Sequence, residues 1–254
     1  MNEEITAQVR QAKQPMFNVP TVVLVLTLIM VLIQLVRTYM LSADMDLQLL
    51  IYFAFWPVRF DPSELGLGTG PGGLFVDLSS FVTYAFLHGS ATHLMLNMVW
   101  MAIFGSVVAR RFGTLRFLLL SAVCAAAGAL MHLVFHFGET IPVIGASAAI
   151  SGHMGAAVRF IWQLGGPLGA VRLRNVDAYR VPAEGLFKSL AEKQTLTFIV
   201  IWGVMNVFAG LGLGSGGGAT NIAWQAHIGG FLAGLLLFSL FDPVPSMDRI
   251  RNGK

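Results

Sequence analysis

The sequence predicts an all-α membrane protein, a bundle of six transmembrane helices with both termini on the cytoplasmic side. Apolar residues make up 56% of the 254 residues and charged residues 11%, whereas soluble domains are about half apolar and about a quarter charged. A helix needs about 20 mostly apolar residues to cross a bilayer. The chain contains six such stretches, separated by charges or by segments rich in Gly and Pro.

The six helices follow one another along the chain, with one long interruption after the first. The first apolar stretch is too long for a cleaved signal peptide and follows acidic Glu3 and Glu4, so we expect it to remain as a spanning helix. The segment 42–90 is predicted to be an outer loop that lies partly in the membrane interface, because aromatic residues precede Pro57 in it. The predicted helices cover residues 19–41, 91–109, 115–137, 143–163, 195–213 and 220–241.

The distribution of Lys and Arg predicts the orientation, because positively charged loops are retained on the cytoplasmic side. Most of these residues flank the helices on one side: Arg10, Lys13, Arg110, Arg111, Arg116, Arg159 through Lys193, Arg249, Arg251 and Lys254. The other side has only Arg37 and Arg59, beside several acidic residues. The tails 1–18 and 242–254 are therefore predicted to be cytoplasmic, on either side of a membrane domain over 19–241.

Five polar residues lie early in the second, fourth and sixth helices, where an unpaired polar group is costly in lipid. They are His93, Asn97, Ser147, Ser151 and His227. In the predicted topology these three helices all begin at the outer face, so the five residues share one depth. This grouping predicts a functional site near the outer surface of the membrane.

Ser147 is the candidate nucleophile. Pro142 and Gly145 predict a loop that turns into a helix at about Ser147. Its hydroxyl and amide would then lie at a helix N-terminus, where developing negative charge is stabilised. The alternative is a structural serine that bonds a backbone carbonyl one turn earlier.

His227 is the candidate base, and small residues are predicted to bring it close to Ser147. On the fourth helix these small residues are Ser147, Ser151 and Gly155, and on the sixth they are Gly230 and Gly234. Such residues allow close helix packing, so the hydroxyl can donate to the imidazole at about 3 Å. Because the six spans contain no Asp or Glu, the pair is predicted to act as a dyad. The alternative is ordinary tight packing around a structural histidine.

His93 and Asn97 lie four residues apart, on one face of the second helix. Their side chains, with the Ser147 amide, are candidate donors to a tetrahedral oxyanion. A hydrogen bond that holds the second helix to a neighbour is the alternative. His88, five residues upstream, is expected to order the outer loop.

Three short motifs lie in the second, fourth and sixth predicted helices. They are Phe86-Leu87-His88 with His93 and Asn97, then Gly145-Ala146-Ser147, then Ala226-His227-Ile228-Gly229-Gly230 with Gly234. With these motifs in this order, the chain resembles the rhomboid intramembrane serine proteases over nearly its whole length. The resemblance implies a rhomboid-like bundle around a water-filled cavity, with Ser147 as nucleophile, His227 as base, and His93 and Asn97 binding the oxyanion.

The chain departs from the rhomboid pattern at several positions. Ala148 follows the nucleophile where the family usually has Gly, and its methyl group is expected to narrow the substrate cleft. Ser151 stands where some bacterial members have a Tyr stacked on the catalytic His, which predicts a less firmly held base. Ala109 replaces a common Glu of the second helix, and only Trp56 and Arg59 stand in loosely for a Trp-Arg pair of the outer loop.

The resulting functional prediction is a serine endopeptidase that cleaves single-span membrane proteins near the outer bilayer boundary. Its partners are transmembrane substrates and membrane lipid, and we expect a multi-pass protein of the bacterial cytoplasmic membrane. The sequence predicts no oligomeric state. The leading alternative is an inactive rhomboid-like protein that binds membrane clients, although such relatives usually lack the Ser or the His. A small transporter is disfavoured because the spans contain no charge on a pathway.

No cofactor, metal or nucleic acid is predicted. The pair His132 and His136 lacks the Glu that zinc proteases place after the first His. The single cysteine, Cys124, lies in an apolar run and is expected in the core, so neither a disulfide within the chain nor a thiolate cage is possible. Two Gly-rich segments match a dinucleotide fingerprint by spacing, but they lack the strand and helix that such a site needs.

Overall fold

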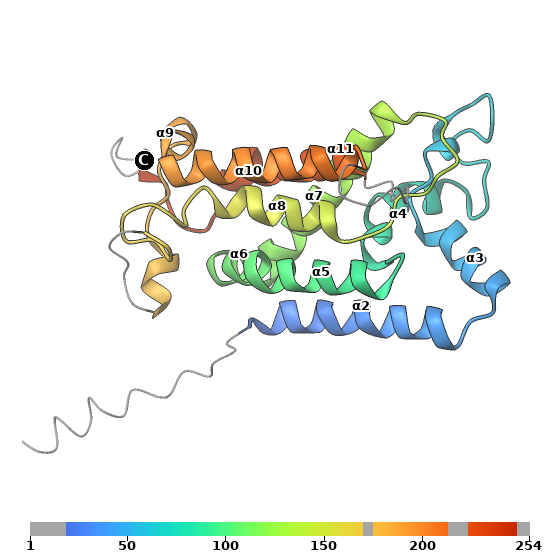
Figure 1. Ribbon diagram of the computed structural model, residues 1–254, viewed down its shortest axis with the longest axis horizontal. Coiled ribbons are helices and arrows are strands. Elements are labelled where there is room, and N and C mark those ends of the chain that lie inside the picture. Colours follow the sequence, from blue (N-terminus) through green and yellow to red (C-terminus); the bar gives the residue numbers. More distant parts are fainter. Residues whose placement is uncertain (1–18, 170–174, 213–222, 248–254) are drawn as a thin grey trace, which may run out of the picture.

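The computed structural model is helical throughout the part of the chain that it describes (Figure 1). The described residues are 19–169, 175–212 and 223–247. Outside them lie the predicted tail 1–18, the end of the predicted tail 242–254, and the predicted helix limits at 213 and 220. Among the described residues, β pairing is confined to an isolated antiparallel bridge between Phe55 and Val143. The predicted all-α class is therefore confirmed for these residues.

Four helices of the described ranges are long and apolar enough to cross a membrane. They are α2 (Thr21–Tyr39), a continuous run Ala91–Phe112, α7 (Thr114–Phe135) and α11 (Trp224–Phe241). The continuous run consists of α5 (Ala91–Trp100), a π-helical turn η3 (Met101–Gly105) and α6 (Ser106–Phe112). All four overlap helices that the sequence predicts.

The fourth predicted helix is much shorter than expected. In place of 143–163, the structure has α8 over Ser147–Ala157, 11 residues, which is about 16 Å of helix. Gly145 has φ +124° and holds the preceding segment outside the helix. All of α8 except Ser147 is buried, so protein rather than lipid surrounds it. A helix surrounded by protein does not need the length or the apolar outer surface of a helix that faces lipid.

The fifth predicted helix is α10 (Lys193–Gly210), which follows the short helix α9 (Leu186–Ala191). It has 18 residues but includes Lys193, Gln194 and Asn206. Most of it faces outward, and Thr195 and Asn206 are its buried residues. Between these two residues, Trp202 stacks on Phe231 of α11 with ring centroids 4.4 Å apart, so α10 also packs on the bundle along its middle.

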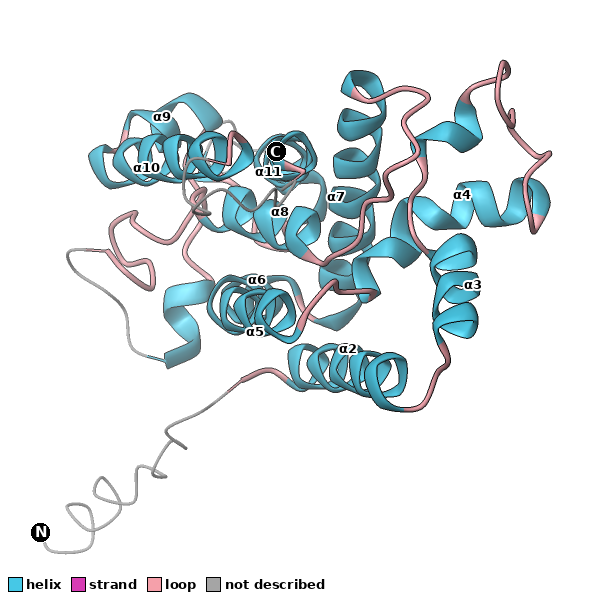
Figure 2. Ribbon diagram, turned by 45° about the vertical axis from the view of Figure 1, so that its right-hand side comes forward, coloured by secondary structure: helices cyan, strands magenta, loops and turns pink. Residues whose placement is uncertain are grey.

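Backbone contact between α8 and α11 forms the centre of the bundle, with α7 beside both (Figure 2). A Cβ added at Gly230 would lie 2.0 Å from the Ala148 carbonyl oxygen, and one at Gly234 would lie 1.9 Å from that of Gly152. On the other helix, a Cβ at Gly155 would lie 2.2 Å from the Phe231 oxygen. The close approach predicted from the small residues is confirmed.

The segment 42–90 is folded rather than an open loop. It contains α3 (Ala43–Phe53), the 3₁₀ turns η1 (Pro57–Phe60) and η2 (Tyr84–Phe86), and α4 (Gly73–Thr83). A buried ion pair anchors it: Arg59 Nη1 lies 2.7 Å from Asp77 Oδ1, and Arg59 Nη2 donates to the Ile51 carbonyl at 2.6 Å. Arg59 therefore fixes this segment without a Trp-Arg pair.

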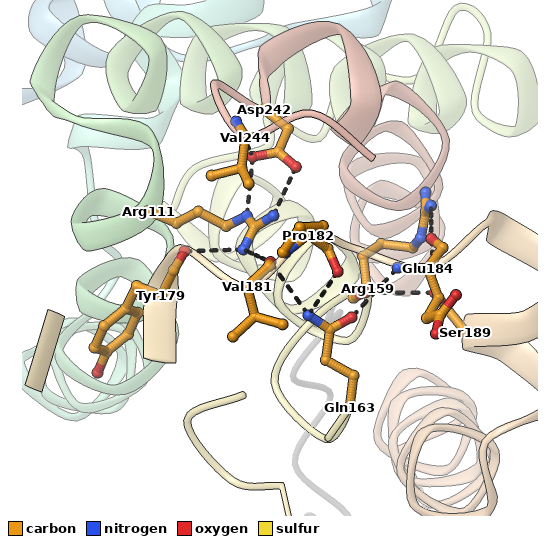
Figure 3. Close-up of polar contacts among 10 residues, drawn as sticks. All are labelled: Arg111, Arg159, Gln163, Tyr179, Val181, Pro182, Glu184, Ser189, Asp242 and Val244. Carbon is orange, nitrogen blue, oxygen red and sulfur yellow. Dashed lines mark hydrogen bonds and ion pairs between the residues drawn. The ribbon is translucent and has the colours of Figure 1, made fainter. Parts of the chain in front are cut away.

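A second set of polar contacts joins the opposite end of the bundle (Figure 3). Arg111, at the end of α6, forms an ion pair with Asp242 at 2.8 Å and donates to the Val181 carbonyl at 2.9 Å. Arg159 donates to the Glu184 carbonyl at 3.1 Å. These bonds tie the ends of α6 and α11 to the segment that contains η4 (Asn175–Tyr179). α6, the helix that carries Arg111, lies at the end of the bundle away from α3 and α4 (Figure 1).

Candidate active site

Ser147 begins α8 and is the one residue of that helix that is not buried. The N-cap residue is Ala146, which has no side chain able to bond the free amides of the first turn. These amides are therefore available to a bound group that carries negative charge. The helix N-terminus predicted at Ser147 is confirmed.

His227 lies one turn into α11 and meets Ser147 directly. Its Nε2 atom is 2.7 Å from Ser147 Oγ, within the range of a hydroxyl hydrogen bond. Gly230, one turn further along α11, sits against the Ala148 carbonyl and allows this approach. A hydroxyl that donates to an imidazole in this way can lose its proton to the ring as it attacks a substrate.

Asn206 of α10 contacts the imidazole ring of His227 at the nitrogen opposite the one that faces Ser147. It is a residue of the site that the sequence analysis did not predict. The distance from His227 Nδ1 to Asn206 Oδ1 is 2.6 Å. The sequence predicts a dyad because the spans contain no Asp or Glu, and this reasoning does not extend to a neutral amide such as that of Asn206. The available signal was a polar Asn in a long apolar stretch, which is costly in a membrane unless it has a partner.

His93 and Asn97 come from α5, whose start is capped by Ser90 accepting from the His93 amide at 3.1 Å. The His93 ring lies against Gly145: a Cβ at that glycine would be 2.8 Å from His93 Nε2 and 3.7 Å from Ser147 Oγ. Asn97 is 5% exposed. Its Nδ2 atom meets no hydrogen-bond acceptor among the described residues.

A cavity of about 770 Å³ is lined by residues of all four helices that carry the site, α5, α8, α10 and α11. Asn97, Ser147 and His227 line it at one end. Its walls continue along α8 and α10 as far as Lys193, and the lining is mostly apolar. The free Asn97 amide and the Ser147 hydroxyl therefore face the same space.

The two residues at which the chain departs from the rhomboid pattern near Ser147 are both buried. The Ala148 methyl points at α7, where a Cβ at Gly128 would lie 2.5 Å from it, and Ala148 is not part of the cavity lining. The expectation that this methyl narrows the cleft is therefore wrong. Ser151 lines the same cavity as His227.

His88 lies outside the membrane spans and connects the outer segment to α2. Its carbonyl accepts from Arg37 Nη1 at 2.8 Å, and its ring is 5.1 Å from that of His93 between centroids. Burial lowers the pKa of His88 to about 4, and the neighbouring His93 contributes to the shift. These contacts agree with the predicted role of His88 in ordering the outer loop.

Comparisons with known proteins point in the same direction as the geometry. The family model for the rhomboid domain matches residues 76–242. The rhomboid protease GlpG of Yersinia pestis (strain Pestoides F) and that of Yersinia pseudotuberculosis serotype O:3 (strain YPIII) are each 27% identical over 164 residues, which is 64% of this chain and 48% of the relative. The protein of the same name from Yersinia enterocolitica is 27% identical over 163 residues, with the same shares covered. The chain spans about half the length of the curated relatives it matches.

Proposed function

The chain belongs to the rhomboid family of membrane proteins, and from this we propose that it is a serine endopeptidase that cleaves single-span membrane proteins near the outer bilayer boundary. The observation that carries the proposal is the 2.7 Å contact between Ser147 Oγ and His227 Nε2 at one end of an apolar cavity. Ser147 is the nucleophile and His227 the general base.

The reaction proceeds through an acyl-enzyme. Ser147 Oγ attacks the scissile carbonyl carbon while its proton passes to His227 Nε2, which gives a tetrahedral oxyanion. The protonated His227 then donates to the leaving amine, the C–N bond breaks, and the acyl group remains on Ser147. Water from the outer side hydrolyses this ester, with His227 again acting as base.

Three donors are proposed to bind the oxyanion: the Ser147 amide and the side chains of His93 and Asn97. The Asn97 Nδ2 group is buried and has no acceptor among the described residues, so it can donate to a substrate oxygen without first breaking a bond. Donors that are already in place and shielded from water stabilise developing charge most strongly.

The membrane arrangement is part of the proposal. We place six segments in the membrane, α8 and α10 together with the four long helices, and both termini on the cytoplasmic side of a bacterial cytoplasmic membrane. Substrates enter sideways past α10, because the cavity runs along that helix between Lys193 and Asn206. The substrate must unwind locally, since a regular helix shields its carbonyl groups.

An alkyl fluorophosphonate tests whether Ser147 is an activated nucleophile. We expect the purified protein in detergent to form one covalent adduct on Ser147, with release of fluoride, and the rate to fall about 10²-fold in His227→Ala because the general base is lost. Mass spectrometry locates and measures the adduct. His136→Ala, which removes a histidine near the end of α7, should be labelled like the unaltered protein. A protein that binds membrane clients but forms no adduct would be an inactive relative.

Gly145→Ala is expected to lower kcat about tenfold, less than the roughly 10² to 10³-fold for complete removal of an oxyanion donor. The added methyl would lie 2.8 Å from His93 Nε2, so the ring must move. Gly113→Ala is the matched control, because Gly113 also has a positive φ, +74°, but has nothing within 4 Å of the added atom. Both changes should lower the unfolding temperature. Equal kcat values in the two variants, measured with a single-span reporter, would argue against a role for His93.

A further inference from the structure

We propose that Asn206 is a positioning residue that completes a Ser147-His227-Asn206 arrangement, in which α10 holds the base in its reactive tautomer. The inference rests on the proposed function, because it concerns the same base. It replaces the dyad expected from the sequence with three side chains from three different helices. Asn206 does not touch the reacting atoms and acts through His227.

The bonds around Asn206 determine which way its amide faces. Asn206 Nδ2 donates to the Trp224 carbonyl at 3.1 Å, and a carbonyl oxygen can only accept. The other amide atom, Oδ1, therefore faces His227 and accepts from Nδ1–H at 2.6 Å. With the proton on Nδ1, the Nε2 atom carries the lone pair that accepts from Ser147 Oγ. The reversed amide would set two acceptors, Asn206 Oδ1 and the Trp224 carbonyl oxygen, against each other.

The same bond supports the base when it becomes charged. After proton transfer the imidazolium lies within the protein, where a cation without a partner is costly. The Asn206 oxygen still accepts from Nδ1–H, and a hydrogen bond to a charged donor is stronger than a neutral one. Together with the bond from Nε2 to Ser147 Oγ, this bond holds the imidazole ring at both of its nitrogens.

The position of Asn206 also links α10 to catalysis. Thr195 and Asn206 are the buried residues of α10; Thr195 Oγ1 donates to the Val158 carbonyl at 3.4 Å, far from the site. Among the described residues, the polar contacts of α10 with α11 toward this end are the two bonds of Asn206. If this end of α10 moves away, His227 loses its partner, so the site is fully arranged only while α10 is docked.

Two substitutions of Asn206 test whether the residue positions the base or only attaches α10 to the bundle. Asn206→Leu removes both bonds at similar volume, whereas Asn206→Asp keeps the acceptor for His227 Nδ1 but loses the donor to the Trp224 carbonyl. For Asn206→Leu we expect kcat to fall about 10- to 100-fold, as for other residues that orient a reacting group, with KM little changed. For Asn206→Asp we expect most of that loss to be recovered and the acid limb of the pH–rate profile to move to higher pH, because a carboxylate stabilises the imidazolium.

The measurements are kcat, KM and the pH profile for a single-span reporter, with the fluorophosphonate labelling rate as a second readout. Val204→Ala is the control, because Val204 is 61% exposed on α10 and should behave like the unaltered protein. Equal activity of Asn206→Leu and the unaltered protein would overturn the proposal. The proposal would also be overturned if the Leu and Asp variants lost kcat equally and their pH–rate profiles were unchanged. Asn206 would then only attach α10 to the bundle. If the unaltered protein shows no labelling that depends on Ser147, the proposed function itself fails.

Discussion

Replacing Ser147 with alanine is expected to lower kcat/KM for cleavage of a single-span reporter by about 10⁶-fold, the loss seen when a serine protease loses its nucleophile. The reason is that no other hydroxyl in the described site is bonded to His227. The oxyanion donors remain, but without the attacking oxygen there is no acyl-enzyme. Cleavage products of a reporter in proteoliposomes, separated on gels, measure the effect.

The control for this experiment is Ser79→Ala in α4. Ser79 Oγ donates to the Val76 carbonyl three residues earlier, so it is a serine with an ordinary structural bond. This variant should cleave at the rate of the unaltered protein, and both variants should unfold at similar temperatures. Undiminished cleavage by Ser147→Ala would remove Ser147 from the mechanism.

Gly230→Val should have the second-largest effect, because it acts on the seam that brings the base to the nucleophile. The first added carbon would lie 2.0 Å from the Ala148 carbonyl oxygen, which is backbone and has little freedom to yield. Forcing α8 and α11 apart costs about 3 kcal/mol or more and breaks the 2.7 Å bond between Ser147 and His227. We expect a loss of kcat greater than about 10²-fold, the effect of a misplacement of roughly 1 Å.

Gly203→Val is the matched control for this seam. Gly203 is also a helical glycine, but it lies on α10 with nothing within 4 Å of an added Cβ. Thermal unfolding in detergent and reporter cleavage should both be close to those of the unaltered protein, apart from the small difference in helix propensity. Similar losses in the two variants would show that the seam has no special part in the site.

Parts of the structure that depend on local chemistry were predictable. The four long apolar helices overlap their predicted ranges, since a stretch of this length and composition has few alternatives in a membrane. The start of α8 at Ser147 followed from Pro142 and Gly145, which disfavour helix immediately upstream. The pairing of small residues across α8 and α11 followed from their regular spacing.

Other features depended on neighbours that the sequence does not reveal. α8 is 11 residues rather than 21, because α7 and α11 surround it and relieve it of contact with lipid. The segment 42–90 folds around Arg59 and Asp77, whose partners are far apart in sequence. The direction of the Ala148 methyl, toward Gly128, is set by packing between helices.

From sequence alone, the membrane class of the protein, the grouping of its charges and the helices that carry Ser147, His227, His93 and Asn97 could be predicted. Spacing and hydropathy suffice for these because each depends on one segment. The folded chain is needed to see that Ser147 and His227 lie 2.7 Å apart and that Asn206 accepts from the opposite nitrogen of the imidazole. A polar Asn in the apolar stretch of α10 indicates that Asn206 needs a partner, but the rotation and depth of α10, which packing sets, determine that this partner is His227.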